Sequence, residues 1–209
     1  MRNEAVVWNR FAGIYDAIMK RDMPAYGIII QRASALLSPE SNVLEVATGT
    51  GLLAIGLAAS AGRMEAVDIS WDMIAKAQAK AREAGLSNLR FSVQDAYALP
   101  YAADTFDAVM IANTLHIMPR PEKALAEIKR VLKTDGYLLA PTFIHGASLK
   151  AAVVSRLASV TGFRAYHRWT QQSYCDFLED NGWRVTHTEI LPASFPLVYC
   201  QCKPAADTQ

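Results

Sequence analysis

Short apolar runs rich in β-branched and aromatic residues alternate along the chain with longer segments whose apolar residues recur at helical spacing. The runs have the length of buried strands and lie at 43–46, 64–69, 89–93, 106–112 and 137–142. The segments between them predict helices at 52–61, 71–84 and 121–131. Because strands that alternate with helices form crossover units, we predict a mostly parallel sheet with helices on both faces.

The two ends of the chain depart from this alternation. Further helices are predicted at 8–20, 25–37, 148–159 and 170–181. The segments 183–189 and 195–202 have the pattern of strands and are joined by a connection that contains proline. They predict an antiparallel pair at the edge of the sheet, which brings the sheet to seven strands.

Composition and charge narrow the class of protein. Of the 209 residues, 52% are hydrophobic and the formal net charge is +1, so no overall field recruits nucleic acid. The start of the chain shows no apolar leader, and the longest apolar stretch, at 52–61, is too short to span a bilayer. We therefore predict a cytoplasmic protein without an integral membrane segment.

The cysteines, Cys175, Cys200 and Cys202, are odd in number and widely spaced, which predicts free thiols and no metal site.

The first strand runs directly into a glycine-bearing turn and then a helix, over residues 43–61. Glycines at this point let backbone N–H groups approach a ligand, and the helix N-terminus favours negative charge. The run 49–54 satisfies the pattern G-x-G-x-x-A, and Asp68, 17 residues after Gly51, is placed to bind ribose hydroxyls. An NAD enzyme, an enzyme with an adenosine ligand and a purely structural turn all fit this pattern.

Two acids at strand ends favour the adenosine ligand. Glu45 precedes the glycines, where a carboxylate repels a pyrophosphate and attracts an amino group. Asp95 follows the third strand and can accept a hydrogen bond from the exocyclic amine of adenine. The C-terminal strand pair also replaces the second mononucleotide-binding half that a dinucleotide would need.

These residues resemble the class I S-adenosylmethionine-dependent methyltransferases, whose first motif is an acid followed by G-x-G-x-G. Here the motif has Ala47 in place of the first glycine, which is free of strain only where φ is negative. The resemblance spans about residues 8–145, and its further motifs are Val67-Asp68-Ile69-Ser70 with Met73, Gln94-Asp95-Ala96 with Leu99-Pro100, Phe106-Asp107 leading to Asn113-Thr114-Leu115-His116, and Lys129-Arg130-Val131-Leu132-Lys133 before Gly136.

Within this family, the segment 11–16 resembles the N-terminal FxxxAxxYD segment of the ubiquinone/menaquinone-biosynthesis type and its small-molecule and phospholipid relatives. The resemblance implies one Rossmann-like domain over 1–209. We expect an N-terminal helical lid at 1–40, a cofactor-binding core at 41–145, and acceptor-side helices with the C-terminal strands at 146–209. It also implies S-adenosylmethionine as cofactor, with S-adenosylhomocysteine as product and no metal.

Residue roles follow from the same resemblance. Glu45 would lie near the ammonium group of the cofactor, Asp68 would bind the ribose hydroxyls, and Asp95 would read the adenine edge. Tyr15 would close over the sulfonium, and aromatic faces attract cations. The implied cofactor-binding residues are Tyr15, Glu45, Ala47, Gly49, Gly51, Asp68, Ile69, Met73, Asp95, Ala96 and Asn113. A core position for Met73 and a helix-packing role for Tyr15 are the alternatives.

Methyl transfer to a small-molecule acceptor is an in-line displacement, which a general base assists when the acceptor carries a proton. His116, in the loop after the fourth strand, is the candidate base, and with Tyr15 it forms the candidate catalytic pair seen in phosphobase methyltransferases. A histidine that only bonds loop backbone is the alternative. His145 is a second candidate. His167 could line the acceptor site, although a solvated basic loop over 164–169 is the preferred interpretation.

The sequence does not decide whether the methyl acceptor is a lipid, an amine or a quinone-like molecule. The apolar stretch 147–163, with Arg156 and Arg164, could line an acceptor site or contact a lipid surface, and as an ordinary covering helix it needs neither role. Two other functions are compatible with the sequence: an NAD-dependent oxidoreductase, which Glu45 and Asp95 disfavour, and a cofactor-binding protein that does not catalyse, which Ala47 leaves open.

Overall fold

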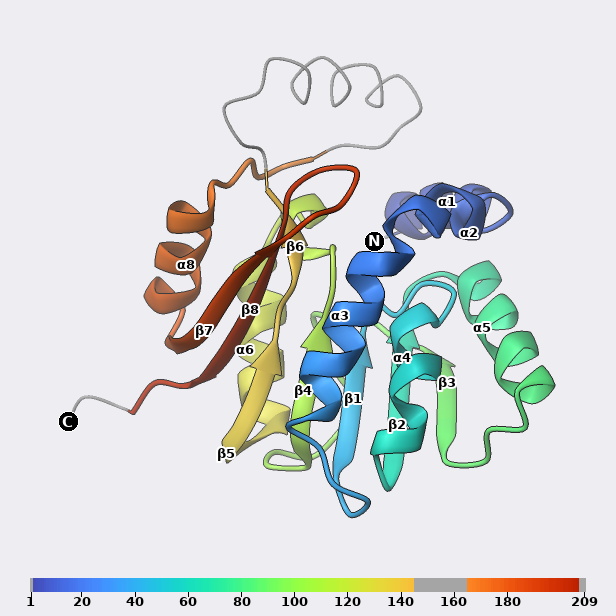
Figure 1. The fold of residues 1–209 in the computed structure, drawn as a ribbon, viewed down its shortest axis with the longest axis horizontal. Coiled ribbons are helices and arrows are strands. Elements are labelled where there is room, and N and C mark those ends of the chain that lie inside the picture. The colour runs from blue at the N-terminus through green and yellow to red at the C-terminus, as the bar shows by residue number, and fades with distance from the viewer. Residues whose placement is uncertain (1, 145–164, 207–209) are drawn as a thin grey trace.

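The computed structural model describes residues 2–144 and 165–206, with side chains from residue 5. All strands belong to one sheet in the order β3-β2-β1-β4-β5-β8-β6, with β7 paired to β8 (Figure 1). The strands are β1 Asn42–Val46, β2 Arg63–Asp68, β3 Leu89–Val93, β4 Phe106–Ile111, β5 Leu132–Leu139, β6 Thr142–Phe143, β7 Trp183–Leu191 and β8 Leu197–Pro204. Strands β1 to β5 are parallel, and the predicted C-terminal antiparallel pair is β7 with β8.

The predicted seven strands and the eight observed strands describe the same sheet. Both β5 and β6 pair antiparallel with β8, through Leu139 with Gln201 and Thr142 with Val198. Both pairs have the same register along β8, so β6 is a continuation of β5 after a short interruption. The interruption falls at Pro141, which has no N–H to donate to the ladder.

Helices cover both faces of the sheet, with α3, α4 and α5 on one face and α6 and α8 on the other (Figure 1). The helices are α1 Arg2–Phe11, α2 Tyr15–Met19, α3 Met23–Ser34, α4 Leu52–Leu57, α5 Trp71–Glu83, α6 Pro121–Val131 and α8 Gln171–Asp180. Short 3-10 turns lie at η1 Lys20–Asp22, η2 Ala58–Ser60 and η3 Leu115–Ile117.

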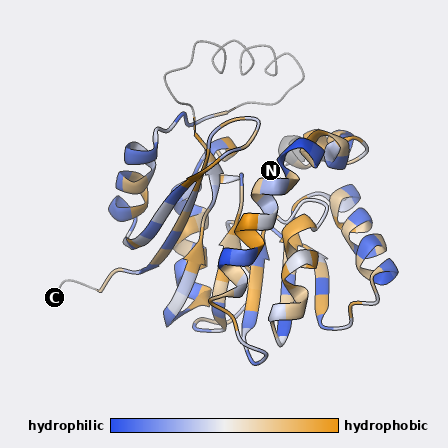
Figure 2. Ribbon diagram, viewed as in Figure 1, coloured by the Kyte–Doolittle hydropathy of each residue, from blue (hydrophilic) through white to orange (hydrophobic). Residues whose placement is uncertain are grey.

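The strands are apolar on both sides because each face is buried under helices (Figure 2). Along β4, Ala108 and Met110 belong to the core under α3, α4 and α5, whereas Val109 and Ile111 belong to the core under α6 and α8. This alternation explains why the run in the sequence is continuously hydrophobic.

Side chains cap the starts of two helices that were predicted by their ranges, α5 and α8. The side chains of Ser70 and Thr170 each accept a hydrogen bond at 3.2 Å from a backbone N–H in the first turn of α5 and α8. The same helices end before Gly85 and Gly182, whose φ angles are +66° and +79°.

The single helix predicted over 8–20 is wrong. Helix α1 ends at Phe11, and α2 begins at Tyr15 after a turn that contains Gly13. Glycine is a weak helix former, so the chain can change direction here, and α2 is free to approach the glycine turn. The helix predicted over 52–61 is also shorter, because α4 ends at Leu57 and continues as a 3-10 turn.

The predicted helix at 148–159, together with His145, Arg156 and Arg164, lies outside the described residues. No helix in the part of the chain that the structure describes is both long and apolar enough to cross a membrane.

Candidate active site

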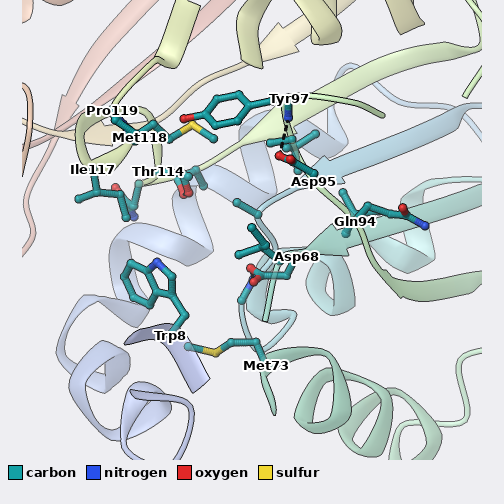
Figure 3. A pocket seen from close by; sticks show the side chains of 18 of the residues that line it. Trp8, Asp68, Met73, Gln94, Asp95, Tyr97, Thr114, Ile117, Met118 and Pro119 are labelled. Atoms are coloured by element: carbon teal, nitrogen blue, oxygen red, sulfur yellow. Dashed lines mark hydrogen bonds between the residues drawn. The ribbon is translucent and has the colours of Figure 1, made fainter. Parts of the chain in front are cut away.

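A cavity lies at the carboxyl ends of β1 to β4, where the strand order reverses between β1 and β4. It encloses about 830 Å³, including its open mouth. In Figure 3, Trp8 lies beside Met73 at one end of the cavity, and Tyr97 lies beside Asp95 at the other. The described residues that line it are Trp8, Tyr15, Val46, Ala47, Gly49, Val67, Asp68, Ile69, Met73, Gln94, Asp95, Ala96, Tyr97, Ala112, Asn113, Thr114, Ile117, Met118 and Pro119.

The turn after β1 holds three residues in the left-handed region. The φ angles are +57° at Ala47, +56° at Gly49 and +79° at Gly51. The condition under which alanine is free of strain at position 47, a negative φ, is therefore not met, and a left-handed non-glycine residue is strained by about 1–2 kcal/mol. Ala47 lines the cavity, so this strain is held at the candidate binding site.

The two glycines of the turn serve different purposes. A Cβ atom at Gly51 would lie 2.9 Å from the ring of Phe91 and 3.1 Å from the Cβ of Ala77, so this glycine allows the turn to pack against α5 and β3. Gly51 does not line the cavity in the described structure. Gly49 does, and a Cβ there would lie 3.6 Å from the ring of Tyr15. Gly49 is therefore the glycine whose backbone faces both the cavity and the aromatic side chain above it.

Asp68 ends β2 and lines the cavity although it is only 8% exposed. Its carboxylate accepts hydrogen bonds from the backbone N–H of Gly49 at 2.8 Å and of Ser70 at 2.9 Å, one on each oxygen. Burial raises the pKa of Asp68, and these backbone bonds oppose the shift. A carboxylate has about four lone-pair sites, so each oxygen keeps capacity for a ligand hydroxyl.

Glu45, near the end of β1, is buried behind the turn and does not itself line the described cavity. Its carboxylate accepts a hydrogen bond from the hydroxyl of Thr48 at 2.5 Å. Burial raises its pKa to about 8, hydrogen bonds from Thr48 and from the backbone of Ala54 lower it in part, and the charge of Asp68 raises it further. A cationic group nearby would relieve this unfavourable burial of negative charge.

The predicted adenine-side residues Ile69, Met73, Asp95 and Ala96 all line the cavity. Asp95 accepts a hydrogen bond from the backbone N–H of Tyr97 at 2.9 Å, which fixes the carboxylate at the cavity edge. Met73 is 1% exposed, so it belongs to the core and also lines the cavity.

Sequence reasoning missed Trp8, which reaches the cavity from α1 and lies beside Met73 (Figure 3). The aromatic residues at 8, 11 and 15 were a signal that the N-terminal segment packs on the core. The sequence did not show that the chain breaks after Phe11 and so brings both Trp8 and Tyr15 to the same cavity.

Asn113 follows β4 in a left-handed conformation, with φ at +52°, and lines the cavity. Its amide nitrogen donates to the hydroxyl of Tyr26 at 2.9 Å. Its side-chain oxygen is buried and accepts no hydrogen bond from the described residues. A buried acceptor without a donor is unfavourable, so this atom is suited to a ligand N–H or O–H.

Tyr15 is held beside Tyr26, Asp68 and Glu45. Burial, then Tyr26 and the two acids, raise its pKa well above the ordinary value of 10. The phenol therefore stays neutral at physiological pH, and it can cover a ligand or donate a hydrogen bond but cannot act as a ready base.

The N-terminal helices are fastened over the cavity by polar contacts. Asp16 accepts a hydrogen bond from the hydroxyl of Thr50 in the glycine turn and pairs with Lys80 of α5 at 2.8 Å. On α1, the side-chain oxygen of Asn9 accepts a hydrogen bond from the hydroxyl of Ser70 at 2.6 Å. These contacts position Tyr15 and Trp8 on the cavity.

His116 is 5% exposed and does not itself line the described cavity, whereas Thr114 and Ile117 on either side of it do. Its Nδ1 lies 3.0 Å from the hydroxyl of Thr142, and its backbone carbonyl accepts hydrogen bonds from the N–H groups of residues 166 and 167. His116 therefore joins the cavity loop to β6 and to the segment that precedes α8, and its role as a base stays a prediction.

The interpretation of 164–169 as a solvated basic loop is wrong for two of its residues. The ring of His167 stacks on Trp169 at 5.0 Å, and its Nε2 lies 3.1 Å from the carbonyl of Met118. Trp169 is buried and also stacks on Phe177 of α8. These contacts hold the segment against the cavity loop, and Arg168 is exposed.

Within residues 2–144 and 165–206, no group of three or more His, Cys, Asp and Glu side chains is placed to hold a metal ion. The arrangement at the cavity is instead acidic at its base and aromatic at its cover. It suits an organic cation that carries hydroxyl groups and an aromatic base.

Comparison with known proteins is consistent with this site. Residues 43–136 match the family described as a methyltransferase domain. The ubiquinone/menaquinone biosynthesis C-methyltransferase UbiE of Sinorhizobium fredii is 43% identical over 105 residues, which cover 48% of this chain and 41% of that protein. The chain thus spans less than half the length of this curated relative.

Two solved structures share the fold. The YcgJ protein of Bacillus subtilis has a TM-score of 0.73 and 18% identity, covering 88% of this chain and 99% of that chain. A SAM-dependent methyltransferase of Aquifex aeolicus has a TM-score of 0.67 and 22% identity, covering 84% and 88%. Residues 43–136 thus carry a methyltransferase domain, and the chain shares the fold of S-adenosylmethionine-dependent methyltransferases. Over the matched residues, the chain is similar to the UbiE-type C-methyltransferases.

S-adenosylmethionine is the cofactor of this class, and the residues present fit it. The buried oxygen of Asn113 needs a donor, and the cofactor carries an ammonium group and hydroxyls. The acids Glu45 and Asp68 suit its positive charge, and a pyrophosphate would be repelled by them.

Proposed function

We propose that the protein transfers the methyl group of S-adenosylmethionine to a lipid-soluble, quinone-like small molecule. The observation that carries this proposal is a set of three acids near the ends of three neighbouring parallel strands: Asp68 and Asp95 line the cavity, and Glu45 is buried behind it. A cation with a ribose and an adenine matches acids in these three places, because each acid meets a different donor.

Each acid has its own part in binding. Asp68 would accept both ribose hydroxyls, since its oxygens each hold only one backbone N–H in the structure. Asp95 and the backbone of Ala96 would bind the adenine edge, between the apolar side chains of Ile69 and Met73. Glu45 would balance the ammonium group from behind the turn, and Asn113 would offer its buried oxygen.

The cofactor supplies an electrophilic methyl group on a positively charged sulfur. The contribution of the chain is to orient the acceptor and to exclude water. Tyr15, which faces Gly49 and keeps its proton, would cover the charged centre with its ring, an attraction of roughly 0.5–2 kcal/mol. Trp8 would close the same cavity at the end where Met73 lies.

An acceptor that loses a proton needs a base, and His116 is the candidate. The contact of Nδ1 with the hydroxyl of Thr142 at 3.0 Å would orient the ring. This role predicts that His116→Gln lowers kcat by about 10²-fold or more, while affinity for S-adenosylhomocysteine is unchanged. A loss below tenfold, with a raised KM for the acceptor, would instead assign His116 to positioning of the loop.

Two features support a quinone-like acceptor. The relative from Sinorhizobium fredii is named as a C-methyltransferase of ubiquinone and menaquinone biosynthesis. In this chain, the cavity wall contributed by the loop after β4 is largely apolar at Ile117, Met118 and Pro119.

The acceptor can be tested with isotopically labelled S-adenosylmethionine and a panel of demethylated quinols, phenols and amines. We expect label in the organic phase and attached to a ring carbon of the quinol, as located by mass fragmentation. Label on amines alone would contradict the acceptor class and leave the cofactor assignment standing. A protein that binds S-adenosylhomocysteine and methylates no member of the panel would contradict the catalytic proposal.

A further inference from the structure

Helix α2 is apolar on both of its faces. Tyr15 and Met19, four residues apart, point into the protein, where Tyr15 lines the cavity and Met19 is buried. Ile14 and Ile18, also four residues apart, lie about 100° around the helix from this pair and are 54% and 53% exposed. Residues at this spacing share one side of a helix, so the outer face of α2 presents large aliphatic side chains to solvent.

The exposed charges around this outer face are mainly positive. Of the two acids in this segment, Asp16 is paired with Lys80 and Thr50, and Asp22 is buried, where it accepts a hydrogen bond from the backbone N–H of residue 194. Lys20 and Arg21 are exposed. We call Ile14, Ile18, Lys20, Arg21 and Met23 the N-terminal apolar surface.

A tryptophan lies on the neighbouring element. Trp71 begins α5 and is 72% exposed, the largest value among the exposed large hydrophobic residues of the described chain. The residue before it, Ser70, is hydrogen-bonded to Asn9 of α1, which places Trp71 next to the N-terminal helices. The exposed Arg10 lies on the same helix α1. Tryptophan and basic residues beside exposed aliphatic side chains are typical of segments that lie at a membrane interface.

We propose that the N-terminal apolar surface, with Trp71, docks on an anionic lipid bilayer. The aliphatic side chains would enter the boundary of headgroups and acyl chains, and Arg10, Lys20 and Arg21 would meet the lipid phosphates. A lipid is favoured over a protein partner because the exposed bases Arg10, Lys20 and Arg21 outnumber the exposed Asp72 beside Trp71, and because the apolar residues lie on the outside of a short helix.

Docking in this orientation has a consequence for the active site. Tyr15, on the neighbouring face of α2, covers the cavity, so the bilayer would lie against the helix that closes the site. A lipid-soluble acceptor would then be taken from the membrane rather than from water. This last step rests on the proposed function, whereas the docking itself does not.

Co-sedimentation with vesicles tests the proposal. We expect the full chain to bind vesicles of phosphatidylcholine and phosphatidylglycerol at least about tenfold more tightly than vesicles of phosphatidylcholine alone, and salt to reduce the difference. The double variants Ile14→Ser with Ile18→Ser, and Lys20→Gln with Arg21→Gln, should each weaken this binding by about tenfold or more.

The matched control is Ile190→Ser, which removes an isoleucine that is 51% exposed on β7. It should bind vesicles like the wild type. All variants are first checked by thermal melting and by calorimetric titration with S-adenosylhomocysteine, and neither should change, because none of these residues lines the cavity. Failure of the wild type to bind S-adenosylhomocysteine would count against the proposed function and not against docking.

Equal binding to both kinds of vesicle would overturn the proposal, and so would wild-type affinity in the Ile14→Ser and Ile18→Ser variant. Self-association in sedimentation equilibrium that this variant abolishes, in a protein that does not bind vesicles, would assign the surface to a second copy of the chain and would also overturn it.

Discussion

The carboxylate of Asp16 accepts a hydrogen bond from the hydroxyl of Thr50 at 2.5 Å, across 34 residues of sequence. Asp16 adjoins Tyr15 at the start of α2, and Thr50 lies in the glycine turn. Lys80 of α5 pairs with the other carboxylate oxygen at 2.8 Å. One side chain thus joins the cover of the cavity to its floor and to one of its walls. Partial burial opposes ionisation, but the hydrogen bonds from Lys80 and Thr50 prevail and lower the pKa of Asp16.

Weakening this contact should speed the exchange of ligand. We expect Asp16→Asn to raise the dissociation rate of S-adenosylhomocysteine by about tenfold, because about 1–1.5 kcal/mol of charged hydrogen bonding is lost. Stopped-flow fluorescence can measure this, since Trp8 lies at the cavity. The control is Glu83→Gln, which neutralises an exposed acid at the end of α5. An unchanged dissociation rate would show that α2 does not cover the ligand.

Glu45 should make the ligand-free protein less stable as the pH rises. Burial raises its pKa from 4.5 to about 8, so the folded state binds this proton more tightly than the unfolded state. Its contribution to stability is therefore full below the usual pKa and is lost as the pH rises through the folded value. Glu45→Gln should raise Tm over the wild type by an amount that grows from about pH 5 to about pH 8.

The control for this series is Glu40→Gln, an exposed acid before β1. Its Tm should follow the wild type at each pH. A difference between Glu45→Gln and wild type that does not change with pH would contradict the assignment of a raised pKa to Glu45.

Binding of the cofactor product should release protons. An ammonium group near Glu45 favours its ionised form, so S-adenosylhomocysteine should displace up to about one proton near neutral pH. Calorimetry in two buffers of different ionisation enthalpy measures this number directly. The release should be reduced in Glu45→Gln, which should also bind more weakly. Equal heats in both buffers for the wild type would place the ammonium away from Glu45.

Ala47→Gly should stabilise the fold. The left-handed alanine is strained by about 1–2 kcal/mol, and the entropy that glycine adds to the unfolded chain offsets about half of the relief. We expect the free energy of unfolding to rise by about 0.5–1 kcal/mol and Tm by about 2 °C. Ala126→Gly, at an exposed position of α6, should instead destabilise by about 1 kcal/mol. A loss of stability at position 47 would contradict the conformation of the turn.

The sequence predicted the acids of the site because parallel strands bring their carboxyl ends to one edge. Glu45, Asp68 and Asp95 are far apart in the chain, yet each lies near the end of an apolar run or just after it, and this pattern places all three at one edge of the sheet. The N-caps were also predictable, because Ser70 and Thr170 act on backbone groups only three residues away.

Contacts decided by tertiary packing were not predictable. The position of Trp8 depends on the break after Phe11, and the partner of Asn113 is Tyr26, which a packed α3 brings to it. The stacking of His167 on Trp169 likewise depends on Phe177 of α8. Nor does the sequence show that Ala47 adopts a positive φ, since that angle is imposed by the turn around it.

Calorimetric titration with S-adenosylhomocysteine and, separately, with NADH tests the central claim most directly. We expect the wild type to bind S-adenosylhomocysteine and not NADH, and Asp68→Asn to bind about tenfold to a hundredfold more weakly, since a charged hydrogen-bond acceptor for the ribose is lost. Thermal melting of Asp68→Asn confirms that the variant is folded. Binding of NADH without S-adenosylhomocysteine would contradict the assignment and favour an oxidoreductase in its place.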